Sequence, residues 1–322
     1  MMTKHLPFAC AACAFAATNV LAADAFPNKP VRIVVPFAAG GGVDLTARIL
    51  AQKLTERVGV SFIVDNRVGA SGIIGTEYVA KAAPDGYTLL VGSQTSQAVV
   101  PAMYLKLNYD AARDFTGVTE IAVSPLVIVI HPSLPVKTVK DLIALAKARP
   151  GELTFGAASG GTPHMAGELF KLQAKVDLLF VPYKGEGPAI ADALGGQISM
   201  VFSNLPVGLP QAQGGRLRAL AVTSKQRVAT APDVPTVAES GLPGYEASTW
   251  FGLFAPVATP RELITRLNAE AVGALSGADV KERMAAQGLF VVANTPEQFA
   301  DFLKLEIPKW AKIVKDAGVK PQ

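Results

Sequence analysis

Apolar strands in this chain repeatedly run through a glycine-containing turn into an amphipathic helix. The first case is the segment VRIVVPFAAGGGVDLTARILAQKL, in which Leu45, Ile49 and Leu54 fall on one face of the predicted helix. The same order recurs three more times, so that the glycine turns lie at residues 40–42, 69–75, 156–161 and 185–187. Strands that alternate with helices predict an α/β fold with a parallel sheet.

Two long apolar segments, near residues 123–130 and 248–255, bracket a central region with the same strand and helix pattern. Single hydrophobic cores stop growing at about 250 to 300 residues, so we interpret these segments as strands that cross between two lobes. The predicted boundaries give a signal segment at 1–25, a discontinuous lobe 1 at 26–124 and 249–322, and a lobe 2 at 125–248.

Helix boundaries are marked most clearly in three places. The segment TVKDLIALAKARPG has a T-x-x-D capping box and a closing Pro-Gly. Two more helices are expected at 260–275 and 295–317, the second opening with Thr295 and Pro296 in favourable order. Pro308 lies inside that second helix and is expected to kink it.

Residues 1–25 have a short basic start, an apolar stretch and small residues suited to cleavage. These features predict a secretory signal peptide. A membrane anchor is the less favoured alternative, because Thr18 and Asn19 interrupt the apolar run before the roughly 20 residues that a span needs.

Cys10 and Cys13 both lie in this signal segment, so the mature chain is expected to lack thiols. That excludes disulfides, cysteine nucleophiles and cysteine-ligated metals. His5 leaves with the signal as well, and His131 and His164 are too few for a histidine-rich metal site. We expect no metal and no cofactor.

The formal net charge of +4 is scattered along the chain without a block of Lys or Arg. This disfavours nucleic acid as a partner, and a mild positive field suits small anions. Nucleotide binding is also disfavoured, because GASGIIG does not have the G-x-G-x-x-G spacing and no G-x-x-x-x-G-K-[ST] occurs.

The glycine turns themselves predict a site for a carboxylate. Helix N-termini carry free N–H groups and a partial positive charge, and glycine lets an anion approach the backbone closely. In open α/β sheets such turns lie at the carboxyl ends of the strands, where ligands bind. The alternative, that each glycine only makes a tight turn, stays open for any single one of them.

Several side chains near these turns have two interpretations. Asp44 either favours the helix dipole as an N-terminal acid or orients a water, and Phe37 is either core or an apolar wall for a ligand. His164 is more often a packed or capping residue than a ligand contact. Lys184 and Glu186 are expected to be a solvated pair, and Trp250 and Trp310 are expected to be hinge and packing residues.

An enzyme hypothesis rests on Ser159, whose surroundings AASGG resemble a degenerate nucleophile elbow. Ala157 stands where that motif has glycine, and His164 follows only five residues later. A secreted serine hydrolase is therefore the weaker alternative to a binding protein.

The segments FPNKPVRIVVPFAAGGGVDLTARILAQKL, VDNRVGASGIIGTEYVAKAAPDGYTLLVGS, VPYKGEGPAIADALGGQ, GRLRALAVTS, PDVPTVAESGLPGYE and WFGLFAP together resemble a known family. They are similar to the periplasmic substrate-binding receptors of tripartite tricarboxylate transporters, the Bug or TctC-like family. The resemblance covers essentially the whole mature chain in the same order.

This resemblance implies a type II periplasmic binding protein fold, with two lobes that close on a small carboxylated ligand and two hinge crossings. It implies a receptor without catalysis, located in the periplasm, that holds its ligand with bridging waters and delivers it to membrane permease subunits. A carboxylate sensor that feeds a signalling partner is the alternative within the same fold. The residues leave the identity of the ligand open.

Ligand-binding positions carried over from the family lie on the glycine turns and on two strand ends. They are Phe37, Ala38, Ala39, Gly40, Gly41, Asp44, Ala70, Ser71, Ser93, Gln94, Thr95, Ser159, Thr162, His164, Gly185, Gly187, Pro188, Phe202 and Asn204. The chain departs from the family where Ala38 and Ala39 replace two prolines and where Val100 precedes Pro101. Because the two alanines replace prolines, the first loop is expected to be less rigid than usual, and Pro308 is a further departure.

Overall fold

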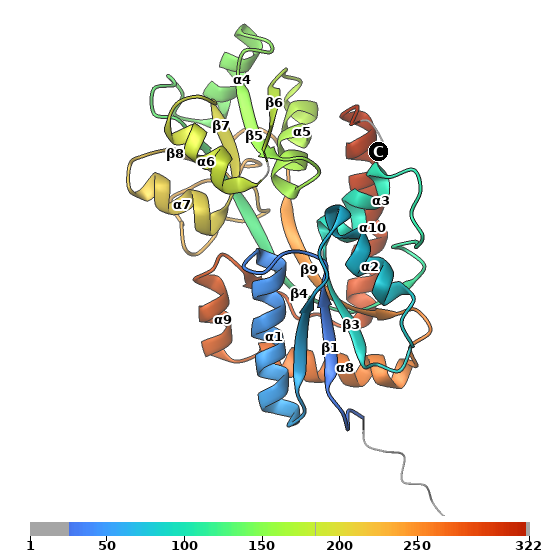
Figure 1. Ribbon diagram of the computed structural model, residues 1–322. Helices are drawn as coiled ribbons and strands as arrows, with labels where there is room; N and C mark the ends of the chain where they lie inside the picture. Colours follow the sequence, from blue (N-terminus) through green and yellow to red (C-terminus); the bar gives the residue numbers. More distant parts are fainter. Residues whose placement is uncertain (1–25, 184, 320–322) are drawn as a thin grey trace, which may run out of the picture.

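The computed structural model describes residues 26–183 and 185–319 of the chain (Figure 1). The predicted signal segment, Lys184 and the last three residues lie outside them. Strands and helices alternate as expected, and they build one curled ten-stranded sheet with helices on its faces. None of the helices in this described part combines the length and the apolar character needed to cross a membrane.

The first region of the sheet is parallel. Strand β1 (Val31–Val35) lies between β2 (Phe62–Asn66) and β3 (Thr88–Ser93). Helix α1 (Gly42–Val58) follows β1, and helix α2 (Ile73–Ala80) follows β2. All three strands therefore end at one edge, where the predicted turns begin.

Two long strands connect this region with the second one. Strand β9 (Ser248–Pro256) pairs with β3, and β4 (Phe115–Ile130) pairs with β9 as far as Pro125. From Leu126 onward β4 pairs with β7 (Met200–Asn204) and β8 (Arg218–Val222). All these pairings are antiparallel, so the expectation of a parallel sheet is wrong for the crossing strands, because an unbroken apolar strand carries no signal of its direction.

The second region repeats the first arrangement around β5 (Thr154–Ala158), which is parallel to both β6 (Leu179–Tyr183) and β7. Helix α5 (Thr162–Ala174) follows β5, α6 (Glu186–Leu194) follows β6, and α7 (Leu205–Gln213) follows β7. Figure 1 shows this region above the first one, with β4 and β9 running between them.

Helix ends follow the predicted signals. Helix α4 (Val139–Ala148) begins with a complete capping box between Thr138 and Asp141. Helix α10 (Pro296–Asp316) begins with one between Thr295 and Gln298, and it continues through Pro308 without a break. The helix expected at 260–275 is α8 (Arg261–Leu275), whereas α7, α9 (Ala278–Ala285) and the short strand β10 (Phe290–Val291) were not predicted.

The core consists of apolar clusters on the two faces of the sheet. Leu50 of α1, Ile264 of α8 and Met284 of α9 pack on one face of the first region. Trp310 of α10 belongs to a larger cluster that continues into the second region with Phe202. Helix α10 therefore covers the opposite face of the long strands (Figure 1).

Candidate functional site

The predicted ligand turns all follow the carboxyl ends of parallel strands, and one hydrogen bond joins the two regions there. Oγ1 of Thr162, the first residue of α5, donates to Oε1 of Gln94, which follows β3, at 2.7 Å. The backbone approaches closely as well, since a Cβ added at Gly160 would lie 2.9 Å from Sδ of Met103. The turns after β3 and β5 are therefore in direct contact.

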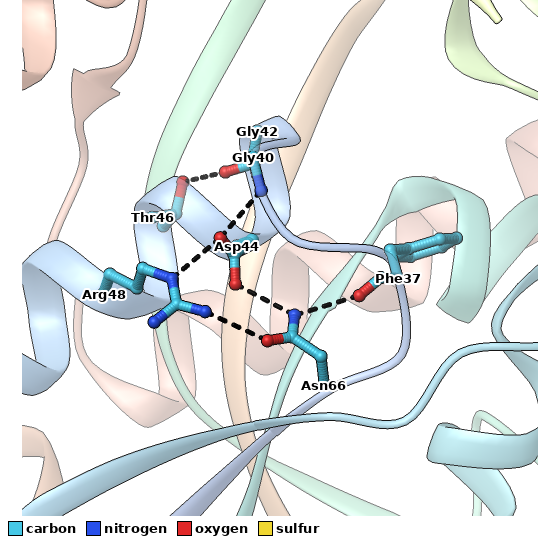
Figure 2. Close-up of polar contacts among 7 residues, drawn as sticks. All are labelled: Phe37, Gly40, Gly42, Asp44, Thr46, Arg48 and Asn66. Atoms are coloured by element: carbon cyan, nitrogen blue, oxygen red, sulfur yellow. Dashed lines mark hydrogen bonds and ion pairs between the residues drawn. The ribbon is translucent and has the colours of Figure 1, made fainter.

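The turn after β1 is built around the buried carboxylate of Asp44 (Figure 2). Its Oδ2 accepts hydrogen bonds from the Gly40 N–H at 2.9 Å and from Arg48 Nε at 2.8 Å. Asn66 Nδ2 donates to Asp44 Oδ1 at 2.9 Å and to the Phe37 carbonyl at 3.0 Å. These hydrogen bonds to Asp44 therefore fix the shape of the glycine turn.

Electrostatics keep this carboxylate charged. Burial acts to raise the pKa of Asp44, but hydrogen bonds from Arg48, Gly40 and Asn66 outweigh it and leave that pKa below its usual value. Among the described residues, no side chain caps α1, whose N-cap is Gly41. Asp44 thus holds the turn and does not act as a side-chain cap, while Ala38, Ala39 and Gly41 stay exposed.

The turn after β2 has a strained backbone. Ala70 and Ser71 have φ values of 45° and 54°, in the left-handed region that residues with a Cβ rarely adopt. Both are exposed. A Cβ added at Gly72 would lie 3.1 Å from the ring of Phe37, so the turns after β1 and β2 pack against each other. This strain is the kind that clusters at ligand sites.

The end of β3 continues into a π-helical turn, Thr95–Val99, with Ser93 and Gln94 buried beside it. The Ser93 N–H donates to Ser96 Oγ at 3.0 Å, which closes the turn. Within the described structure, Nε2 of Gln94 is buried without a hydrogen-bond partner. An unpaired buried amide donor next to the strand ends is suited to a ligand oxygen or to a water.

Ser159 and His164 do not form a catalytic pair in the described structure. Nδ1 of His164 accepts the Gly160 N–H at 3.1 Å, and its ring stacks on Phe180 at 3.7 Å between centroids. Burial lowers the pKa of His164 to about 4. The imidazole is therefore a packed capping group with its nitrogen already occupied, while Ser159 lies exposed at the tip of the turn.

The turn before α6 is tied to the end of β7 by Glu186. This carboxylate accepts hydrogen bonds from Ser203 Oγ at 2.6 Å and from the Asn204 N–H at 2.7 Å. Burial raises the pKa of Glu186, and these hydrogen bonds oppose the shift. The expectation of a solvated Glu186 is therefore wrong, and its predicted partner Lys184 lies outside the described residues. Gly187 and Pro188 are exposed beside it.

Phe202 occupies a different position from its neighbours in the predicted site. Its side chain is fully buried and packs edge-on against Phe155 at 5.9 Å and Phe170 at 5.8 Å. Phe202 thus supports the end of β7 from within the core, whereas Asn204 is the last residue of that strand. The residues that prediction missed are the supports Arg48, Asn66 and Ser203; the polar end of β2, DNR, was the available signal for Asn66.

The described residues at these turns do not bring together side chains that could ligate a metal ion. No cluster of three or more His, Cys, Asp or Glu side chains within the described ranges is placed to hold a metal ion. The arrangement offers exposed backbone N–H groups, hydroxyls and one buried amide, which is chemistry for holding an anion.

Comparisons with known proteins assign the family. Residues 46–319 match the family described as "Tripartite tricarboxylate transporter family receptor", TctC. The chain is 41% identical to Protein BugT of Bordetella pertussis (strain Tohama I) over 302 residues, which are 93% of each chain.

Solved structures agree. Rpa4515 of R. palustris, determined with adipate, has a TM-score of 0.81 and 39% identity, over 92% of this chain and 100% of that one. MatC of Rhodopseudomonas palustris, determined with bound malate, has a TM-score of 0.76 and 32% identity, over 90% of this chain and 100% of the other. The fold is thus the two-lobed fold of periplasmic binding proteins, and this chain belongs to the TctC family of receptors of tripartite tricarboxylate transporters.

Proposed function

We propose that the chain is exported to the periplasm, captures a small carboxylate between its two lobes and delivers it to the permease subunits of a tripartite transporter. The family and the carboxylates in the related structures support this class of ligand. The observation that carries the proposal is the Gln94–Thr162 hydrogen bond, since it brings turns from two regions of the sheet together.

Strand pairing supports the lobe boundaries that we propose. Strand β4 pairs with β9 up to Pro125, opposite Ser248, and changes to β7 at Leu126, opposite Asn204. We therefore place lobe 1 at 26–124 and 249–322 and lobe 2 at 125–248, with β4 and β9 as hinges. Closure is then a shift of population toward a state in which the ligand contacts both lobes.

The ligand carboxylate is held by three kinds of group. Exposed amides of the first turn, at Ala38, Ala39 and Gly41, meet it beside the N-terminus of α1. Ser71 and Ser159 add hydroxyls from turns in opposite lobes. Waters bridge the remaining distance, as is usual for polar sites of this kind.

A receptor of this kind has no catalytic step, and the contacts of His164 support that assignment, because its Nδ1 is occupied by the Gly160 N–H. The alternative, a serine hydrolase that uses Ser159, would be established if the chain hydrolysed ester or amide substrates and Ser159→Ala lost that activity.

The test is a titration of the mature chain with C4 to C6 dicarboxylates, including malate and adipate, followed by calorimetry and thermal unfolding. A ligand at 100 times its dissociation constant should stabilise the fold by about 2.7 kcal/mol. The neutral diamide of the acid that binds is the matched control and should have no effect. Equal binding of acid and diamide would refute recognition of the negative charge.

A further inference from the structure

A cavity of about 590 Å³ lies in lobe 1, and none of the turns described above lines it. Phe115 at the start of β4 and Phe254 near the end of β9 form part of its wall. Ser124, near the switch between lobes, is nine residues further along β4, or about 30 Å at 3.3 Å per residue. The cavity is therefore a separate space on lobe 1, and its lining includes none of the predicted ligand positions.

Most of the wall is apolar. Besides the two phenylalanines, it contains Ile264 of α8 together with Leu303 and Ile307 of α10. The volume lies within the range of about 300 to 1,000 Å³ that is usual for small-molecule sites. Such a wall favours an alkyl or aromatic group that buries its surface there.

One end of the cavity is polar. Thr259 lines it and is 7% exposed, and within the described structure its Oγ1 is buried without a hydrogen-bond partner. An unpaired buried hydroxyl destabilises the fold, and a ligand that accepts its hydrogen bond removes part of that penalty. The unpaired hydroxyl of Thr259 therefore indicates that a ligand in this cavity would place a polar atom beside it.

The start of α8 lies directly beside this hydroxyl. Pro260, the next residue, is the N-cap of this 15-residue helix, and no side chain in the described structure caps it. The first N–H groups of a helix lack intrahelical acceptors, and this end carries a partial positive charge. Arg261 lines the rim, where its guanidinium lies 2.9 Å from the exposed carboxylate of Glu297. The polar end therefore suits a negative group.

We propose that this cavity is a second ligand site, which binds a medium-chain monocarboxylate. The alkyl chain lies against Phe115, Phe254 and Leu303, and the carboxylate accepts hydrogen bonds from Thr259 Oγ1 and from the first amides of α8. A ligand with one polar end fits, because most of the lining residues are apolar. The site is independent of the carboxylate site between the lobes.

Calorimetric titration of the mature chain with octanoate tests the proposal. Saturable binding is expected, and Thr259→Val should weaken it about five- to tenfold, the loss of one hydrogen bond to a charged group. Thr265→Val is the matched control, because Thr265 also lines the cavity but its hydroxyl already donates to the Arg261 carbonyl. Affinity of that variant should stay within about twofold of the original.

Two further measurements separate a ligand role from a structural one. Thr259→Val should raise the melting temperature of the free protein, because it removes an unpaired buried hydroxyl, while it lowers octanoate affinity. Ala300→Trp, which fills the cavity from α10, should abolish octanoate binding and leave the affinity for the interlobe acid unchanged.

Absence of octanoate binding to a folded chain would overturn the proposal. So would binding that Ala300→Trp leaves intact, or octanoate that competes with the acid bound between the lobes. Equal losses in Thr259→Val and Thr265→Val would overturn the assigned hydrogen bond.

Discussion

Thr162 and Gln94, which lie 68 residues apart in sequence, are joined by a 2.7 Å hydrogen bond between their buried side chains. The bond uses the oxygen of the Gln94 amide and leaves its Nε2 without a partner in the described structure. The bond therefore holds the turns after β3 and β5 together and leaves one amide donor available for an additional acceptor. A receptor that closes around an anion needs both properties.

Replacing Thr162 by Val removes the donor at nearly constant shape. The closed state loses one buried hydrogen bond, and the acid that binds between the lobes should bind about fivefold or more weakly. Small-angle scattering should also find a larger radius of gyration for the free variant. Thr162→Ser keeps a hydroxyl and is the control that should bind almost normally. A valine variant with unchanged affinity and shape would remove this bond from the account of closure.

Asp44→Asn tests how the first turn is held. In the variant an amide nitrogen replaces either Oδ2, the shared acceptor of the Gly40 N–H and Arg48, or Oδ1, the acceptor of Asn66. We expect a loss of about 1 to 3 kcal/mol in the free energy of unfolding. Acid affinity should fall as well, because the turn loses its shape. Asp301→Asn breaks an exposed pair with Lys304 and should cost less than about 1 kcal/mol.

The same variant has a pH signature. The folded pKa of Asp44 lies below its ordinary value of 3.8, so its charge stabilises the fold above about pH 4, and that contribution is lost as the pH falls through the folded pKa. Denaturant unfolding below pH 4 should therefore depend less on pH in Asp44→Asn than in the original chain. Identical acid limbs would contradict this assignment.

Sequence patterns were sufficient for the four glycine turns and for most of the helices and strands, although not for α7, α9 and β10. The apolar run before Gly40, the capping box at Thr138 and the Thr295–Pro296 helix start each depend on neighbouring residues, which is why local physics predicts them. The four glycine turns lie at the ends of strands for the same reason.

Local sequence patterns did not predict contacts between residues that are distant in the sequence. Glu186 looked like a surface acid, but it bonds Ser203 and Asn204 of another strand. The antiparallel direction of β4 and β9 likewise depends on which strands meet in space. Such pairings depend on the complete topology, and local composition does not encode them.

Burial lowers the pKa of His164 to about 4, so its imidazole should stay neutral in the folded protein above about pH 4. The unfolded chain binds this proton near pH 6.5, so this group makes stability fall as the pH drops from about 6.5 to 4, by up to roughly 3 kcal/mol. NMR titration of the ring protons measures this pKa directly. A midpoint near 6.5 would contradict the buried, stacked position.

Glu120 should act in the opposite direction. Burial and the nearby charge of Glu306 raise its pKa to about 7, and a hydrogen bond from Asn294 opposes the shift. Its folded pKa exceeds the unfolded one, so the stability it contributes is complete below about pH 4.5 and is lost as the pH rises through 7.

Glu120→Gln keeps a neutral side chain of the same shape. This variant should therefore gain stability relative to the original chain above pH 7, by about 1 to 3 kcal/mol in denaturant unfolding. Glu152→Gln, on the surface, is the control and should change the free energy of unfolding by less than about 0.5 kcal/mol. A Glu120→Gln variant that loses stability equally at pH 5 and pH 8 would rule out ionisation as the cause.

Backbone amides at the strand ends are the central element of the proposed receptor, and amide NMR reports on them one by one. Two-dimensional ¹H–¹⁵N spectra should be recorded while the acid that binds best in the dicarboxylate panel is added. We expect the largest downfield proton shifts at Ala38, Ala39 and Gly41 of lobe 1, together with shifts around Ser159 of lobe 2. Shifts confined to one lobe, or to residues away from these turns, would contradict it.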